Sequence, residues 1–180
     1  ITLTGDTTAP HVVTTLDQRL LASDGHVVVQ TAGGASPQPL AVGNHSIDNA
    51  RWVYHDNTVW VVLPVPGDKG SFAVPTLQVR LGPQSGSWSL INDAGDNATV
   101  TKNVFYAALD HGSAPRFDFS GYAYAALPGV TLSGAEAAVS AFASSTSIVA
   151  QTDNAHAVLQ TTSATASGDG GSGWVMGAAV

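Results

Sequence analysis

A chain of 180 residues, 44% of them hydrophobic and only 11% charged, is long enough to pack one domain and too apolar for a disordered tail. The net charge of −7 arises from 13 acidic and 6 basic residues, and the basic residues do not cluster, which excludes the cationic surface that a nucleic-acid-binding protein needs. The absence of cysteine excludes disulfides, thiolate metal ligands and thiol catalysis, and the absence of an apolar run of about 18 residues predicts no membrane-spanning helix.

Short runs of β-branched residues, bounded by Gly, Asp and Pro, predict strands in the first part of the chain. These runs are residues 2–4, 12–15 and 26–31. Residues 32–39 are rich in Gly, Ser and Pro, a composition that is typical of a loop. The first ten residues lack the charged and apolar segments of a signal peptide, so we expect the chain to be a mature or cleaved fragment.

The stretch RWVYHDNTVWVVLP, residues 51–64, predicts a β-hairpin. Two runs rich in Val and aromatic residues flank Asp56 and Asn57, and both of these residues tolerate the positive φ of a tight turn. Pro64 is expected to end the second strand, because proline cannot donate a hydrogen bond to a β-ladder. His55 then lies at the elbow of the hairpin.

The remainder of the chain predicts further strands and one helix. The expected strands are residues 77–81, a turn and strand at 86–93, and then 99–109, 121–129, 147–152 and 155–162. Residues 67–76 are expected to form a loop, and residues 163–173 a flexible Gly-rich end. Residues 133–144 predict the helix, because Ser133 can cap it and Glu136, three positions later, completes a capping box. The expected fold class is therefore all-β, an antiparallel β-sandwich with one short helix.

Two His–Asp pairs are the first candidates for chemistry: His55-Asp56 and Asp110-His111. Neighbouring residues of a strand point to opposite faces, so the members of each pair orient each other poorly for acid–base catalysis. Asp56 is better explained as a turn residue, and Asp110-His111-Gly112 as the end of a strand. A Ser-His-Asp triad can assemble across a fold, but the chain has no G-x-S-x-G nucleophile motif.

The sequence predicts no metal site and no cofactor. The six histidines stand singly, without an HxH or HExxH pattern, at His11, His26, His45, His55, His111 and His156. A calcium loop of the DxDxDG type is also absent. The Gly-rich residues 168–173 are not followed by the Lys and the Ser or Thr at a helix start that a phosphate-binding loop needs.

Six aromatic residues leave two interpretations open. They are Trp52, Tyr54, Trp60, Trp88, Tyr122 and Tyr124. Because pyranose faces pack on aromatic rings, these side chains are candidates for a sugar-binding platform. On alternating strands, the same rings fill the core of a sandwich.

Four motifs follow one another along the chain: RWVYHDNTVWVVLP at residues 51–64, GSWSLIND at 86–93, FYAALDHGSAP at 105–115 and YAYAALPG at 122–129. In their order and spacing they resemble the C-terminal half of polysaccharide lyase family 8, which includes hyaluronate lyases, chondroitin AC lyases and xanthan lyases. The resemblance continues as TTLDQR at residues 14–19 and SIVAQTDNAHAVLQ at 147–160, so it covers most of the chain.

The resemblance implies a division of the chain into three parts. Residues 1–131 correspond to the rear part of a central β-supersandwich, residues 132–146 to a helical connection, and residues 147–180 to the start of a smaller C-terminal β domain with the flexible Gly-rich end. The family cleaves acidic polysaccharides by β-elimination, in which a base removes the C5 proton of a uronic acid and an acid protonates the leaving oxygen. Its catalytic Asn, His, Tyr and Arg lie on an N-terminal α/α-toroid, so the resemblance implies no catalytic residue in this chain and assigns no substrate-binding residue.

The leading hypothesis is the β portion of a secreted, extracellular bacterial polysaccharide lyase that acts on hyaluronan, chondroitin or xanthan. The implied partners are the acidic polysaccharide and the α/α-toroid of the same enzyme, with no nucleic acid and no membrane. This portion is expected to support the cleft and to be inactive alone. Two alternatives stay open: a stand-alone carbohydrate-binding β module, and a structural or adhesive surface domain without a ligand.

Overall fold

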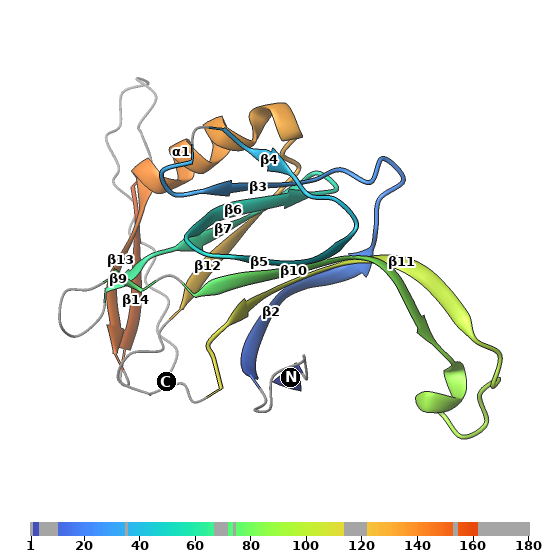
Figure 1. Ribbon diagram of the computed structural model, residues 1–180. Coiled ribbons are helices and arrows are strands. Elements are labelled where there is room, and N and C mark those ends of the chain that lie inside the picture. Colours follow the sequence, from blue (N-terminus) through green and yellow to red (C-terminus); the bar gives the residue numbers. More distant parts are fainter. Residues whose placement is uncertain are drawn as a thin grey trace, which may run out of the picture.

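The computed structural model describes residues 2–3, 11–34, 36–66, 72–73, 75–113, 122–152 and 155–161 (Figure 1). Most of these residues form a sandwich of two five-stranded antiparallel sheets, and a helix covers the outer face of one sheet. The predicted all-β class with one short α-helix is thereby confirmed over the described ranges. In these ranges no helix has the length and apolar character needed to cross a membrane. The Gly-rich end expected at 163–173 lies outside the described residues.

The first sheet has the strand order β1-β2-β11-β10-β5. These strands are β1 (Thr2–Leu3), β2 (His11–Leu20), β5 (Gly43–Ile47), β10 (Thr76–Gly86) and β11 (Val100–Asp110). β10 and β11 pair over their whole length, from Thr76 opposite Asp110 to Gly86 opposite Val100. β2 and β5 flank only one half of this ribbon, so the other half extends beyond the sandwich (Figure 1).

The second sheet has the strand order β12-β7-β6-β3-β4. These strands are β3 (Val27–Thr31), β4 (Gln38–Pro39), β6 (Ala50–His55), β7 (Thr58–Leu63) and β12 (Ala123–Pro128). β6 and β7 form the predicted hairpin, in which His55 pairs with Thr58. Asp56 and Asn57 have φ values of 46° and 55°, the positive values that a two-residue turn of this kind requires.

Shorter elements complete the described part. They are β8 (Val65–Pro66), β9 (Phe72–Ala73), the 3-10 helices η1 (Trp88–Leu90) and η2 (Leu132–Gly134), α1 (Ala135–Ser145), β13 (Thr146–Thr152) and β14 (Ala155–Gln160). The strand predicted within residues 86–93 is wrong, because the chain there closes into η1, where the Ile91 N–H donates to the Trp88 carbonyl. β5 was not predicted, and β4 lies inside the loop expected at 32–39.

Alternate residues of both sheets point inward and form the main core. The second sheet contributes Val27, Val29, Ala50, Val53, Trp60 and Val62, and the first contributes Leu77, Val79, Leu81, Phe105, Ala107 and Leu109. Burial of each Val, Leu or Phe side chain in this core stabilises the fold by about 1.5–3 kcal/mol. The same period of two places Tyr106 and Ala108 in a separate cluster on the opposite side of the first sheet.

Helix α1 packs on the outer face of the second sheet, where a second apolar cluster joins sheet and helix. Its buried members are Val28, Trp52, Tyr54, Val59, Val61, Ala135 and Val139. β6 and β7 are therefore apolar on both faces, which explains why they read as continuous hydrophobic runs rather than as an alternating pattern.

The predicted capping box at Ser133 and Glu136 is wrong. The residue that precedes α1 is Gly134, and no side chain caps the helix. Instead, the Glu136 carboxylate accepts hydrogen bonds from the Arg51 guanidinium and from Trp52 Nε1 at 3.1 Å. Hydrogen bonds from Arg51 and then from Trp52 outweigh partial burial and lower the pKa of Glu136. A cationic guanidinium and a fixed indole N–H replace the backbone amides as partners, and they hold the helix on β6.

Candidate functional site

The polar side chains of the first sheet gather where β2 and β11 meet at one end of the sandwich. We call His11, Thr14, Gln78, Asp110 and His111 the His–Asp cluster. β11 ends at Asp110, and Gly112 follows with a φ of 81°, a value that glycine adopts without strain. The strand therefore ends at the LDHG motif, as predicted, and Asp110 and His111 bond to different partners.

Asp110 is the centre of the His–Asp cluster. Both carboxylate oxygens lie 2.8 Å from His11 Nδ1, and Gln78 Nε2 donates to Oδ2 at 3.2 Å. The Gly112 N–H donates to Oδ1 at 2.8 Å. Partial burial alone would raise the pKa of Asp110, but the hydrogen bonds from Gly112 and His11 outweigh it and lower this pKa. The carboxylate is therefore held ionised by groups of its own sheet.

A chain of hydrogen bonds crosses four strands of the first sheet through Asp110. Gln78 Nε2 lies 3.1 Å from Ser46 Oγ on β5, as well as 3.2 Å from Asp110 on β11. His11 on β2 completes the row. Each polar group on this row is bonded to a neighbour, so the row presents a satisfied polar surface rather than a free acid or base.

His111 belongs to the edge of the sandwich. Its Nε2 lies 2.9 Å from Thr14 Oγ1, and its ring centroid lies 5.0 Å from the ring of Tyr122. Burial lowers the pKa of His111, although the Asp110 charge opposes this shift. A neutral imidazole that bonds to a threonine hydroxyl and packs on a phenol ring joins the two sheets at this edge.

The other predicted pair, His55 and Asp56, does not form a dyad. His55 is fully buried and stacks on Phe105 at a centroid distance of 4.4 Å. The Ala22 N–H donates to His55 Nε2 at 3.0 Å, so the neutral ring carries its proton on Nδ1, which has no hydrogen-bond partner among the described residues. Burial is the largest cause of the lowered pKa of His55. Asp56 lies in the turn, 3.8 Å from an Arg19 nitrogen.

The described residues contain no group of three or more His, Cys, Asp or Glu side chains that is arranged to hold a metal ion. Their cations are also dispersed. Arg19 pairs with Asp17 and lies over the Trp60 ring, Arg51 pairs with Glu136, Arg80 donates to Asn44, and Lys102 stands exposed on β11. In the part of the chain that the structure describes, no cationic cluster is formed that would neutralise a uronate.

The structure separates the six aromatic residues into two sets. Trp52, Tyr54 and Trp60 are 1%, 6% and 2% exposed, so they belong to the two cores. Trp88, Tyr122 and Tyr124 are 62%, 40% and 40% exposed. A common platform of all six is therefore excluded, because half of the rings face the interior.

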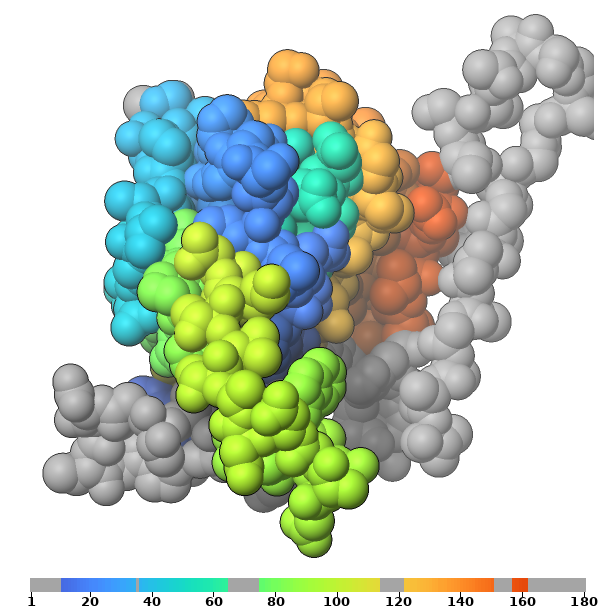
Figure 2. Space-filling model, turned by 90° about the vertical axis from the view of Figure 1, so that its right-hand side faces the viewer, coloured from blue at the N-terminus to red at the C-terminus, as the bar shows by residue number. Residues whose placement is uncertain are grey.

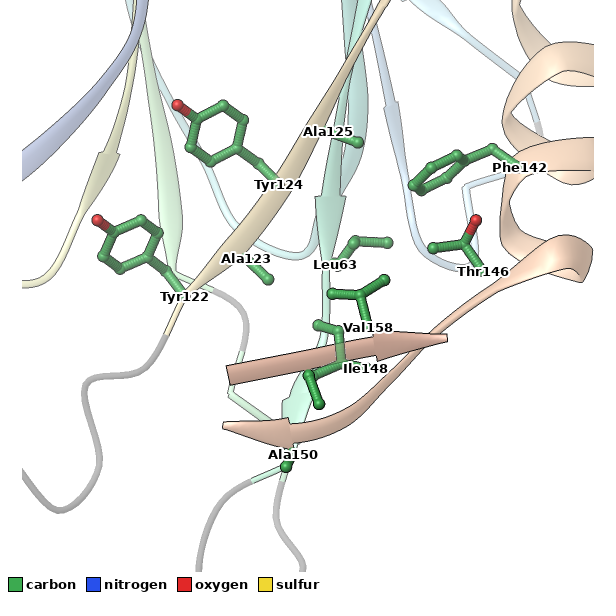
Figure 3. A pocket seen from close by; sticks show the side chains of 11 residues that line it. Leu63, Tyr122, Ala123, Tyr124, Ala125, Phe142, Thr146, Ile148, Ala150 and Val158 are labelled. Carbon is green, nitrogen blue, oxygen red and sulfur yellow. The ribbon is translucent and has the colours of Figure 1, made fainter. Parts of the chain in front are cut away.

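Tyr122 and Tyr124 border an apolar pocket of about 200 Å³ between β12, α1 and the β13–β14 hairpin. Figure 3 shows that the two phenol rings project from one side of the strand, with their oxygens away from Phe142. Ala123 and Ala125 project from the other side, toward Leu63. The pocket is smaller than the roughly 300–1,000 Å³ of a ligand site, so it suits side-chain packing better than a sugar.

Sequence reasoning singled out Asp110 and His111 but missed their partners. His11 and Asp110 are 99 positions apart, and His111 and Thr14 are 97 apart, so only the strand order brings them together. Gln78 lies in the strand predicted at residues 77–81, where a polar residue at an alternate position indicates only exposure to solvent. The local signal at these positions was limited to single polar residues on predicted strands.

The family described as "Polysaccharide lyase family 8, super-sandwich domain" matches residues 1–139. Among solved structures, the chain is similar to the xanthan lyase of Paenibacillus, with 22% sequence identity and a TM-score of 0.62. The similarity covers 84% of this chain but only 14% of the xanthan lyase chain. Among curated proteins, none matches.

Proposed function

The chain belongs to polysaccharide lyase family 8, and we propose that it is the β portion of a lyase that cleaves uronic-acid-containing polysaccharides such as hyaluronan, chondroitin or xanthan by β-elimination. In this proposal the chain supports the cleft, and a companion α/α-toroid carries the catalytic residues. Family membership supports a polysaccharide substrate and companion domains, and the chain spans only 14% of the xanthan lyase chain.

The supporting role rests on one observation: the candidate acid–base groups among the described residues are engaged by other groups of this chain. β-Elimination needs a base at the C5 proton, an acid at the leaving oxygen and a group that neutralises the carboxylate. His55 is enclosed in the core, Asp110 is bonded to three donors, and His111 is bonded to Thr14. All three groups are therefore occupied by contacts within this chain.

The domain division is part of the proposal. β13 and β14 pair only with each other among the described strands, and they follow α1 directly. A lone two-stranded hairpin is marginally stable, which favours residues 147–180 as the start of a further β domain and residues 132–146 as a connection. A secreted bacterial location is proposed because polymers of this size are degraded outside the cell.

The test compares the 180-residue chain with the intact lyase that contains it. Formation of the unsaturated uronate, followed by its ultraviolet absorbance, is measured with hyaluronan, chondroitin and xanthan. We expect product from the intact enzyme on at least one polymer and none from the chain alone. Product from the chain alone would disprove the supporting role, and a folded intact enzyme that cleaves no uronic-acid polymer would disprove the lyase assignment.

A carbohydrate-binding module is the second candidate, because Tyr122 and Tyr124 are both 40% exposed on one side of an edge strand. Stacking on these rings would give the isolated chain a measurable affinity for an oligosaccharide. Titration calorimetry with Tyr124→Ala tests this candidate. Binding that the substitution abolishes would favour it, whereas no binding by the unsubstituted chain would exclude it.

A further inference from the structure

The half of the β10–β11 ribbon that lies beyond the sandwich forms an arm, residues 82–103. The neighbouring strands stop at its base: the last pairs are Leu81 with Gly43 of β5 and Val104 with Leu20 of β2. Beyond them one further backbone hydrogen bond joins the base of the arm to the body, from the Leu21 N–H to the Asn103 carbonyl at 2.9 Å. The rest of β10 and β11 pairs only with each other, and the arm projects from the body of the molecule (Figure 2). The arm is therefore an isolated two-stranded ribbon, which is marginally stable without packing partners.

At the base of the arm, the backbone of β10 bends at Gly82. Gly82 has a φ of 133°, which disfavours residues with a side chain. A Cβ at this position would also lie 2.9 Å from Cγ1 of Val42, so this path of the backbone favours glycine. Figure 1 shows the ribbon turning away from the second sheet toward its tip.

The tip of the arm, residues 87–98, is held in one conformation by its own hydrogen bonds. The Ile91 and Asn92 N–H groups both donate to the Trp88 carbonyl at 3.0 Å, and the Gly95 N–H donates to the Asn92 carbonyl at 2.7 Å. A Cβ at Gly95 would lie 2.6 Å from the Trp88 carbonyl, so only glycine permits this closure.

That conformation points large apolar side chains into solvent. Trp88 is 62% exposed, and Leu90 and Ile91 are each 80% exposed, although the strands of the arm carry polar side chains such as Gln84 and Thr101. None of the three belongs to an apolar core. Their burial against another surface would therefore be gained only through association.

The charges of the tip indicate which kind of partner surface can cover Trp88, Leu90 and Ile91. Asp93 and Asp96 are exposed beside the apolar residues, while Lys102 lies farther back on β11. Two carboxylates repel an acidic polysaccharide, and adjacent leucine and isoleucine offer a sugar no hydrogen bonds. A protein surface with an apolar socket and a basic rim would complement this tip.

We propose that the tip of the arm docks on a companion domain of the same lyase, with Trp88, Leu90 and Ile91 in an apolar socket and Asp93 and Asp96 facing cations at its rim. This inference rests on the proposed function, because the companion domain is part of that enzyme. The acidic tip then has a partner of opposite charge in the domain that must attract a polyanion. Through this contact the arm fixes the orientation of the β portion relative to the rest of the enzyme.

Hydrogen exchange measured by mass spectrometry tests the docking. The amides of residues 88–98 are compared in the isolated 180-residue chain and in the intact lyase. We expect exchange at the tip to be slower in the intact enzyme by about tenfold or more, because docking removes its exposure to solvent. In the intact enzyme carrying Leu90→Asn and Ile91→Asn, exchange should return to the rate of the isolated chain. Leu20→Asn, at a site 61% exposed on β2, is the matched control and should leave the protection in place.

The outcomes separate this inference from the proposed function. Equal exchange at the tip in both samples would overturn the docking even if the intact enzyme cleaves its polymer. Protection of the tip by hyaluronan or xanthan added to the isolated chain would also overturn it, since the tip would then bind sugar. Failure of the intact enzyme to form unsaturated product would disprove the lyase assignment, whatever the exchange rates.

Discussion

The two sheets of the sandwich share a core but differ in their outer faces. The outer face of the second sheet is apolar and lies under α1, with Trp52 1% exposed and Val139 1% exposed. The first sheet carries the hydrogen-bonded row of Ser46, Gln78 and Asp110. The second sheet thus has an apolar outer face covered by a helix, whereas the first sheet carries polar side chains that bond to one another.

The comparison of the two sheets also indicates which part of the molecule associates with a partner. The polar side chains of the Ser46–Gln78–Asp110 row bond to one another, so this row needs no further partner, while Val13, Tyr106 and Ala108 are buried on the same face. The arm that extends from the same sheet ends instead in exposed Trp88, Leu90 and Ile91. We therefore expect substitutions under the helix to affect folding, and substitutions at the tip of the arm to affect only the assembled enzyme.

Truncation under the helix should have the largest effect on folding. Trp52→Ala removes a ring that is 1% exposed and a hydrogen bond to Glu136, so we expect a loss of about 3–5 kcal/mol in the free energy of unfolding. Trp88→Ala, the matched control on the arm, should change this free energy by less than about 0.5 kcal/mol. Urea denaturation followed by circular dichroism measures both. Equal losses would contradict the division between a structural face and an associating arm.

An intermediate effect is expected on the polar face. Asp110→Ala leaves His11 Nδ1 and the Gly112 N–H without their acceptor and removes one of the two acceptors of Gln78, so the free energy of unfolding should fall by about 1–3 kcal/mol. Asp93→Ala, at an exposed position on the tip, should change it by less than about 0.5 kcal/mol. The same urea titration serves for both variants. A neutral Asp110→Ala would mean that the row contributes no stability.

The smallest effect is a pH dependence that originates in two imidazoles, the buried His55 and the half-buried His111. Burial lowers the pKa of His55 and of His111 in the folded chain below the ordinary value of 6.5. Below pH 6.5 the unfolded chain therefore binds protons before the folded chain does, so the free energy of unfolding should decrease as the pH falls from 6.5 toward the folded pKa values. Well above pH 6.5 both imidazoles are neutral in both states, and their contribution is constant.

His111→Gln should make this decrease shallower, and His55→Phe should do so independently. His26→Phe, at an exposed site, controls for the loss of an imidazole. Urea midpoints measured at closely spaced pH values report the slope. An unchanged slope in both His111→Gln and His55→Phe would contradict the assignment of the pH dependence to these two imidazoles.

Local patterns predicted the elements that local chemistry determines. Asp56 and Asn57 specify the β6–β7 turn by themselves, and α1 was located by its composition. The capping box failed because Glu136 bonds to Arg51, 85 positions away, a partner that no local pattern contains. The helical closure at Trp88 failed because exposed apolar residues beside polar ones resemble an ordinary strand.

The candidate site was less predictable than the fold. The sequence indicated that His55 lies at a hairpin elbow, but its burial against Phe105 depends on how the two sheets pack. His11 and Asp110 meet only because β2 and β11 are neighbours in the first sheet. Contacts between residues so far apart follow from strand order, which alternating hydrophobicity does not determine.

The most direct test of the central claim is the kcat of the intact lyase with His11→Ala and His111→Ala introduced together. If the chain supports the cleft without carrying catalytic groups, kcat should stay within about tenfold of the unsubstituted enzyme, since general acid–base residues contribute roughly 10²–10⁴-fold. Circular dichroism establishes that the variant is folded. A folded variant whose kcat falls by about 10³-fold or more would contradict the account and place acid–base chemistry on this chain.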